Sequence, residues 1–267
     1  MEIIKIPANA VQIISTSSKG DQSKWQLEER WIKQNTRGYE GQAEVLASLI
    51  LQCSTLSSSN YVNYYPCKIE LPDGTRQQGC YSYDFRRELQ EVTLERLFEV
   101  NFTSTDAILN SQESAARKFE QLMSQVEQFT GINVREDIAR LFAFDALILN
   151  EDRHTNNILF LYDPIHHSWK LAPIFDNGLS LLSDEKDYKI GTPISVLIRQ
   201  VKAKPLTSSF SRQLKLYTGE PFIDKTKLLK QLEETDIDFG RAKDVLFTQL
   251  RNPAFAHLFI DGDDSND

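Results

Sequence analysis

The stretch Leu147–Phe160, LILNEDRHTNNILF, constrains the fold more than any other part of the sequence. An apolar run stops at Asn150, seven polar residues follow, and apolar residues resume at Ile158. The preceding residues, 136–149, place apolar side chains at helical spacing. Short strands are predicted at 158–162 and 168–174. The polar residues therefore form a loop held at one end by a helix and at the other by a strand.

Three oxygen-bearing side chains stand at the ends of these elements. Asp152 follows the helix, Asn157 precedes the first strand, and Asp176 follows the second strand in the run PIFDNG. Phosphoryl transfer needs such a set, because it depends on positioning and charge neutralisation more than on covalent help. One carboxylate orients the attacking hydroxyl, and a second carboxylate with an amide can hold magnesium, which prefers oxygen ligands. An isolated Asp-Arg-His triplet is more often a capped surface loop, so the full spacing carries the functional interpretation.

The motifs resemble those of a known kinase family. Asp152-Arg-His-Thr-Asn-Asn157 is similar to the D-x-H-x-x-N catalytic loop of bacterial HipA-like kinases and to the D-R-H-x-x-N loop of phosphatidylinositol 3-kinase-like enzymes. The run LAPIFD, which ends at Asp176, resembles the L-A-P-x-Y-D run of HipA-like proteins. The short chain suggests the compact CtkA-type subgroup. The resemblance is strong over residues 136–180 and only topological over 1–100.

The resemblance implies an ATP- and Mg²⁺-dependent Ser/Thr protein kinase, capable of autophosphorylation. It makes Asp152 the catalytic base and Asn157 and Asp176 the magnesium ligands. His154 would support the loop without binding metal, and Arg153 receives no role.

The N-terminal part offers the remaining kinase elements. A kinase lysine pairs with the nucleotide phosphates and is held by a glutamate. Lys33 ends a predicted strand, and a helix predicted over 41–51 follows about ten residues later. Glu44 is the chosen partner and Glu40 the alternative. A solvent-facing strand end remains the structural alternative for Lys33.

Two further segments are candidates for nucleotide contacts. Residues 15–24 lie where a phosphate-covering loop belongs, so Ser17, Ser18 and Lys24 are candidate phosphate contacts, although a solvated hairpin is the more common meaning of such a run. Tyr81 and Tyr83 lie in a predicted hinge near 82–86, where packing is their more common role.

The predicted fold is α+β and bilobal, like a protein kinase. Residues 1–85 would form a small β-rich N-lobe with one helix, residues 86–260 a larger, mainly helical C-lobe, and residues 261–267 an acidic tail. The elements expected from the pattern are strands within 11–34, a hairpin of 61–71 and 77–85, a short segment capped by Thr93, and helices at 112–130, 193–202, 224–235 and 239–250.

The composition of the chain bears on which partners it can bind and on where in the cell it is expected. The net charge of −8 argues against direct nucleic-acid binding. No apolar window is long enough for a membrane span, and no signal peptide precedes the fold, so a cytoplasmic location is expected, with signal-free export left open. The three cysteines are expected to be reduced thiols. Because the small lobe takes most of the chain before Asp152, the extra domain with which HipA toxins contact an antitoxin is not expected, and neither is such a partner.

Two alternatives to a protein kinase remain at this point. The catalytic loop does not distinguish a protein substrate from a lipid or a small molecule. The irregular phosphate loop also leaves open a pseudokinase or nucleotide-binding module, although the complete set of Asp152, Asn157 and Asp176 argues against it.

Overall fold

The computed structural model describes residues 1–14 and 22–260, and the chain in it forms two compact units. The first unit combines Met1–Asp84 and Asp176–Gln200 with the segment from Glu220 onward. The second combines Phe85–Phe175 with Val201–Gly219. The expected α+β class is confirmed. The division into lobes at residues 85 and 86 stays a prediction, although the first segment of the first unit ends beside it, at Asp84.

A six-stranded sheet, ordered β1-β5-β6-β4-β3-β2, forms the framework of the first unit. Strand β1 runs parallel to β5, and every other pair in this sheet is antiparallel. The strands are β1 Glu2–Lys5, β2 Gln12–Ile14, β3 Ser23–Leu27, β4 Arg30–Gln34, β5 Tyr64–Glu70 and β6 Arg76–Tyr83. The predicted strands and hairpin are confirmed, but β1 was missed because its pairing partner lies sixty residues away in the sequence.

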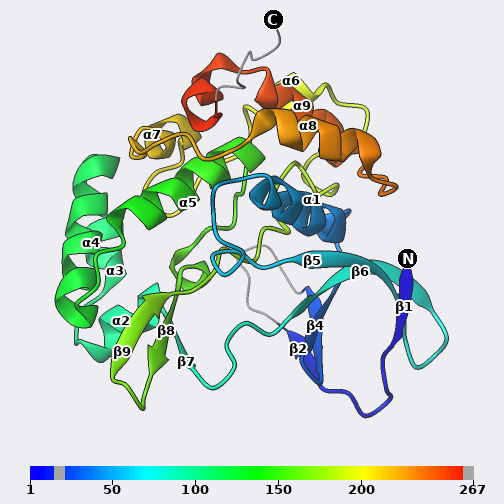
Figure 1. Cartoon of the computed structure of the whole chain (residues 1–267), viewed down its shortest axis with the longest axis horizontal. Helices are drawn as coiled ribbons and strands as arrows, with labels where there is room; N and C mark the ends of the chain where they lie inside the picture. Colours follow the sequence, from blue (N-terminus) through cyan, green and yellow to red (C-terminus); the bar gives the residue numbers. More distant parts are fainter. Residues whose placement is uncertain (15–21, 261–267) are drawn as a thin grey trace, which may run out of the picture. The chain divides into compact units, whose positions relative to one another are not determined.

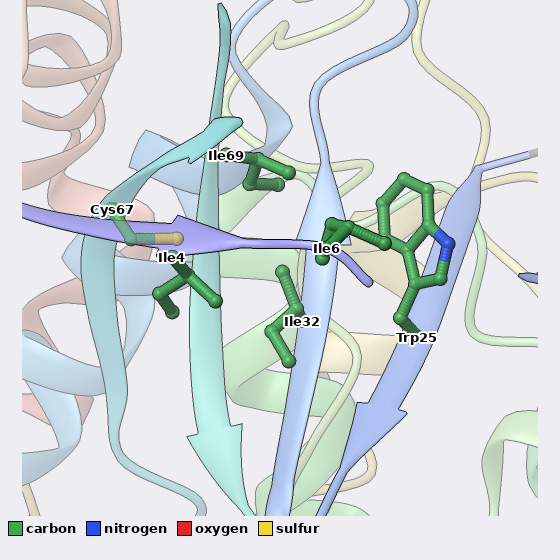
Figure 2. Packing of buried hydrophobic residues seen from close by; sticks show 6 residues of the cluster. All are labelled: Ile4, Ile6, Trp25, Ile32, Cys67 and Ile69. Carbon is green, nitrogen blue, oxygen red and sulfur yellow. The ribbon is translucent and has the colours of Figure 1, made fainter. Parts of the chain in front are cut away.

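One face of this sheet carries a small apolar core, shown in Figure 2. Alternate residues of neighbouring strands meet there, as period two requires. Its buried members are Ile4, Ile6, Trp25, Ile32, Cys67 and Ile69.

Helix α1, Glu40–Gln52, packs against β4, β5 and β6 (Figure 1). It lies on the opposite face of the sheet from that core, because Lys33, which contacts Glu44 of α1, follows the core residue Ile32 along β4. It also contacts α9, so nearly its whole circumference is buried. Its close approach to the sheet depends on glycine, since a Cβ on Gly41 would lie 2.9 Å from the backbone of Gly79. The remaining helices of this unit are α6 Ile194–Leu197, α8 Lys225–Glu234, α9 Arg241–Leu250 and the 3₁₀ helix η2 Pro253–Leu258. Helix α6 is shorter than the predicted 193–202, while α8 and α9 confirm their predictions.

The second unit is built from helices and the three-stranded antiparallel sheet β7-β8-β9. Its elements are β7 Gln90–Thr93, α2 Leu94–Val100, α3 Thr105–Leu109, α4 Ala115–Thr130, α5 Arg135–Ile148, the 3₁₀ helix η1 Thr155–Asn157, β8 Leu159–Asp163, β9 Ser168–Leu171 and α7 Phe210–Leu214. Thr93 caps α2, as predicted, by accepting a hydrogen bond from the Arg96 N–H. The short elements β7, α3 and α7 were missed.

The structure tests two further predictions, that the cysteines are unpaired and that no helix spans a membrane. Cys53, Cys67 and Cys80 are buried free thiols, which confirms the prediction of unpaired cysteines. Burial raises the pKa of the Cys67 thiol to about 12. Among the helices that the structure describes, none is long and apolar enough to cross a membrane.

We predict that Gly79→Ala destabilises the first unit. A Cβ at this position would lie 2.1 Å from the backbone oxygen of Lys33 and 2.7 Å from Ile69 Cδ1, so strands β4 and β6 must separate. Overpacking of this kind costs about 1–3 kcal/mol. Urea unfolding measures the loss. The control is Gly74→Asn in the hairpin turn, where φ is +85°, nothing lies within 4 Å, and asparagine tolerates the conformation. Equal stability of the two variants would contradict the prediction.

Candidate functional site

The first unit gathers three side chains around one buried ammonium group, that of Lys33. We call Lys33, Glu44, Tyr64 and Asp176 together the Lys33 cluster. Lys33 on β4 donates to Glu44 Oε1 of α1 and, over 2.6 Å, to Asp176 Oδ1. It also lies 3.3 Å from the Tyr64 hydroxyl and 4.9 Å from the centroid of the Tyr64 ring. The Lys33 side chain is only 7% exposed. Lys33 is therefore not a solvent-facing strand end.

Two carboxylates, those of Asp176 and Glu44, compensate the buried charge of Lys33. Burial by itself lowers the pKa of Lys33, but the carboxylates of Asp176 and Glu44 together outweigh it and hold that pKa well above its usual value. A buried ammonium without such partners would instead lose its proton. Lys33 thus stays charged at neutral pH.

Glu44, and not Glu40, is the partner of Lys33. Its second oxygen accepts the backbone N–H of Asn177 over 2.8 Å, so it also fixes the chain next to Asp176. Glu40 has another task, because its carboxylate accepts the backbone N–H groups of Thr36, Arg37 and Gly38 and caps that turn. Of the two candidates, Glu44 and Glu40, it is Glu44 that contacts Lys33. The role of Glu44 in nucleotide binding stays a prediction.

Asp176 is held in an unusual backbone conformation. Its φ is +55°, in the left-handed region that aspartate tolerates better than most residues. Its N–H donates to the Tyr64 hydroxyl over 3.2 Å. Its second carboxylate oxygen lies 3.6 Å from Lys24 Nζ, and Lys24 stands opposite Lys33 in the pairing of β3 with β4. Such strained positions are concentrated at functional sites.

Tyr64 was missed by the sequence analysis. Whether Tyr64 or Tyr65 faces the lysine depends on the register of β5 with β6, which no local pattern reveals.

The remaining candidates of the first unit lie elsewhere. Tyr81 and Tyr83 lie on the opposite face of the sheet from Lys33. There Tyr81 stacks on Tyr65, with 5.2 Å between the ring centroids. The Arg30 guanidinium lies over the rings of Tyr81 and Tyr83. The structure does not bring these two tyrosines to the Lys33 cluster. Ser17 and Ser18 lie outside the described residues.

In the second unit, the polar loop is built on a buried ion pair. Arg153, 1% exposed, donates to both oxygens of Asp145 on α5, over 2.9 and 3.1 Å. Its other nitrogen donates to the backbone oxygens of Asn157, over 3.0 Å, and Phe175, over 2.8 Å. Arg153, which had no role in the sequence analysis, therefore ties the loop to the helix before it and to the end of the strand pair after it. Asp145 was missed, although a lone acid in the apolar run FAFDALIL is a signal for a buried partner.

The loop presents Asp152 and Asn157 in fixed positions. The Asp152 N–H donates to Asn150 Oδ1, and Asn157 Nδ2 donates to the Asp152 carbonyl, each within 3.0 Å. The bond of Asn157 Nδ2 leaves its amide oxygen as the atom suited to a cation. His154 Nε2 lies 3.8 Å from Asp152 Oδ2, which agrees with a supporting place and not with a direct hydrogen bond.

The oxygen atoms of two candidate residues suit a hard cation. Asp176 offers carboxylate oxygen and Asn157 amide oxygen, both of which suit magnesium. Among the described residues, no cluster of three or more His, Cys, Asp or Glu side chains is arranged to hold a metal ion. Asn157 belongs to the second unit and Asp176 to the first, so their joint role stays a prediction.

Comparison with known proteins bears on the fold. No protein-family model and no curated protein matches the sequence. Among solved structures, the chain resembles the proinflammatory kinase CtkA of Helicobacter pylori, with a TM-score of 0.55 and 14% identity over 92% of this chain and 93% of that one. HipA in a complex with HipB and operator DNA, from Shewanella oneidensis MR-1, gives a TM-score of 0.42 and 11% identity over 96% of this chain and 65% of that one. The chain thus has the CtkA-type kinase fold that its motifs predicted.

We predict that Arg153→Met strongly destabilises the second unit. The substitution leaves the buried Asp145 carboxylate without its counter-charge and two carbonyls without a donor. Removing one partner of a buried ion pair costs about 3–5 kcal/mol. The free energy of unfolding in urea measures this loss. Arg96→Met is the control, because Arg96 is 64% exposed and pairs with Glu99 at the surface, where pairs contribute little. Arg153→Met with the stability of the control would contradict a structural role for this ion pair.

Proposed function

We propose that the chain is an ATP- and Mg²⁺-dependent kinase that transfers a phosphoryl group to a serine or threonine hydroxyl, including hydroxyls of its own chain. The observation that carries the proposal is the Lys33 cluster, in which a buried, charged lysine is held by a helix glutamate beside a partly exposed aspartate. The CtkA-type fold supports it, and CtkA is itself a kinase.

Each residue has a defined task in the proposed reaction. Lys33, oriented by Glu44, would bind the α- and β-phosphates, and Lys24 would add positive charge there. Asp152 would orient the acceptor hydroxyl and accept its proton. Asn157 and Asp176 would hold magnesium, which neutralises charge on the phosphates when bound. The Ser/Thr preference and the use of ATP rest on the motif resemblance.

The proposal includes a cytoplasmic location and a protein substrate of unknown identity. Three free thiols are typical of proteins from a reducing compartment.

Autophosphorylation with radiolabelled ATP and Mg²⁺ tests the proposal. We expect incorporation that EDTA abolishes, with phosphate mapped to serine or threonine by mass spectrometry. Asp152→Asn should slow transfer about 10²–10⁴-fold, the usual contribution of a general base. Asp176→Ala should do so as well, because it removes both a proposed metal ligand and a partner of Lys33.

Asp163→Asn is the matched control. Asp163 lies in the β8–β9 hairpin and pairs with His166 Nδ1 over 2.7 Å, outside the proposed machinery. Undiminished transfer by a chain carrying both Asp152→Asn and Asp176→Ala would refute the assignment. Calorimetric binding of ATP without any transfer would identify a nucleotide-binding module instead. Transfer only to a phosphoinositide or a small alcohol would identify a lipid or small-molecule kinase.

A further inference from the structure

Lys204 lies beside Asp152. In the sequence, the basic run from Ile198 to Lys204 is consistent with a segment that faces an anionic substrate, but a solvated helix end is the more common role of such a run. Helix α6 instead ends at Leu197, and buried positions alternate with more open ones from Val201 to Lys204. Lys202 is exposed, whereas Lys204 turns its ammonium group to Asp152 Oδ1 over 3.4 Å.

The backbone that carries Lys204 is fixed from within the second unit. Gln213 of α7 is fully buried, and its amide nitrogen donates to the Lys204 carbonyl over 2.9 Å. Its amide oxygen accepts the N–H of Leu206 over 3.1 Å. Helix α7 packs against α5, the helix that leads into the polar loop. Lys204 and Asp152 are therefore supported by the same pair of helices.

A structural role accounts poorly for this contact. The Lys204 side chain is 34% exposed and Asp152 8% exposed, and ion pairs with an exposed partner add little stability. Arg153 already anchors the loop through four hydrogen bonds. Lys204 is thus a cation that reaches the carboxylate of the proposed base from a partly open position.

We propose that Lys204 is a further catalytic residue, whose ammonium group binds the phosphoryl group while it passes to the acceptor hydroxyl at Asp152. This inference rests on the proposed kinase activity. The acceptor oxygen forms a bond to the γ-phosphorus, the bond from that phosphorus to the β,γ-bridging oxygen breaks, and ADP leaves with the bond electrons. The hydroxyl proton goes to Asp152. Lys204 takes no part in this proton transfer, and its ammonium group stabilises the negative charge on the phosphoryl oxygens.

Rates of autophosphorylation in the full chain test the role. Lys204→Ala should lower the rate constant at saturating ATP about 10²-fold, as expected when one preorganised donor is lost. The ATP concentration at half-maximal rate should stay within about twofold, since Lys33 and Lys24 carry the proposed ground-state contacts. Lys204→Arg should recover part of the rate. Lys202→Ala, two residues away and exposed, is the matched control and should behave as the wild type.

Thermal unfolding of each variant separates chemistry from folding. We expect Lys204→Ala to unfold at the wild-type temperature, because the contact adds little stability. An equal rate for Lys204→Ala and Lys202→Ala in an active wild type overturns the role of Lys204 and leaves the kinase proposal standing. A slow Lys204→Ala that also melts early, with no recovery in Lys204→Arg, overturns it too. A wild type that transfers no phosphate overturns both proposals.

Discussion

The buried ammonium of Lys33 is the constraint on which the arrangement of the first unit depends. A charge away from water is tolerated only with compensating charges and hydrogen bonds. Strand β4 supplies the lysine, α1 the glutamate, β5 the tyrosine, and the chain at Asp176 the second carboxylate. Each of these segments must then stay close enough to keep its side chain in hydrogen-bonding contact with Lys33. The close packing of α1 on β6, which requires glycine at position 41, is what brings Glu44 to the lysine.

The second unit also holds a buried cation, Arg153, but encloses it more completely. Comparing the two cations distinguishes a structural role from a functional one. Arg153 is enclosed, and it donates to the Asp145 carboxylate and to the backbone oxygens of Asn157 and Phe175. In the Lys33 cluster, Asp176 remains 22% exposed, and Lys204 beside Asp152 is 34% exposed. A cation that is fully enclosed by protein acceptors can hold a loop but cannot meet a ligand. A cation next to a partly open carboxylate, as Lys33 is, can do both, and so can a cation that is itself partly open, as Lys204 is. This is why these two lysines, and not Arg153, enter the proposed chemistry.

The sequence predicted those parts of the fold whose signal is local. Residues 136–149 and 239–250 repeat apolar side chains over several helical turns. Residues 72–75, PDGT, lie between the strands predicted at 61–71 and 77–85, and their sequence favours a tight hairpin turn. β1 and β7 are four-residue strands that exist through pairing with distant strands, so their signal lies in β5 and β8. The contacts of Tyr64 and Lys204 likewise depend on distant parts of the chain and could not be predicted from local sequence. The face on which Tyr64 lies is set by the register of β5 with β6, and Lys204 is brought to Asp152 by the packing of α7 on α5.

The charge distribution also explains how an acidic chain could accept a polyphosphate. With a net charge of −8, long-range attraction does not favour an anion. In the first unit, however, Lys33 and Lys24 both face the Asp176 carboxylate. Bound phosphates would compete with Asp176 for these two ammonium groups, and the released carboxylate would then need a new cation. Phosphate and magnesium binding would therefore be coupled, because each satisfies a charge that the other uncovers. A buried site with balanced charges can in this way be specific for the nucleotide and the cation together, while either one alone would leave a charge uncompensated.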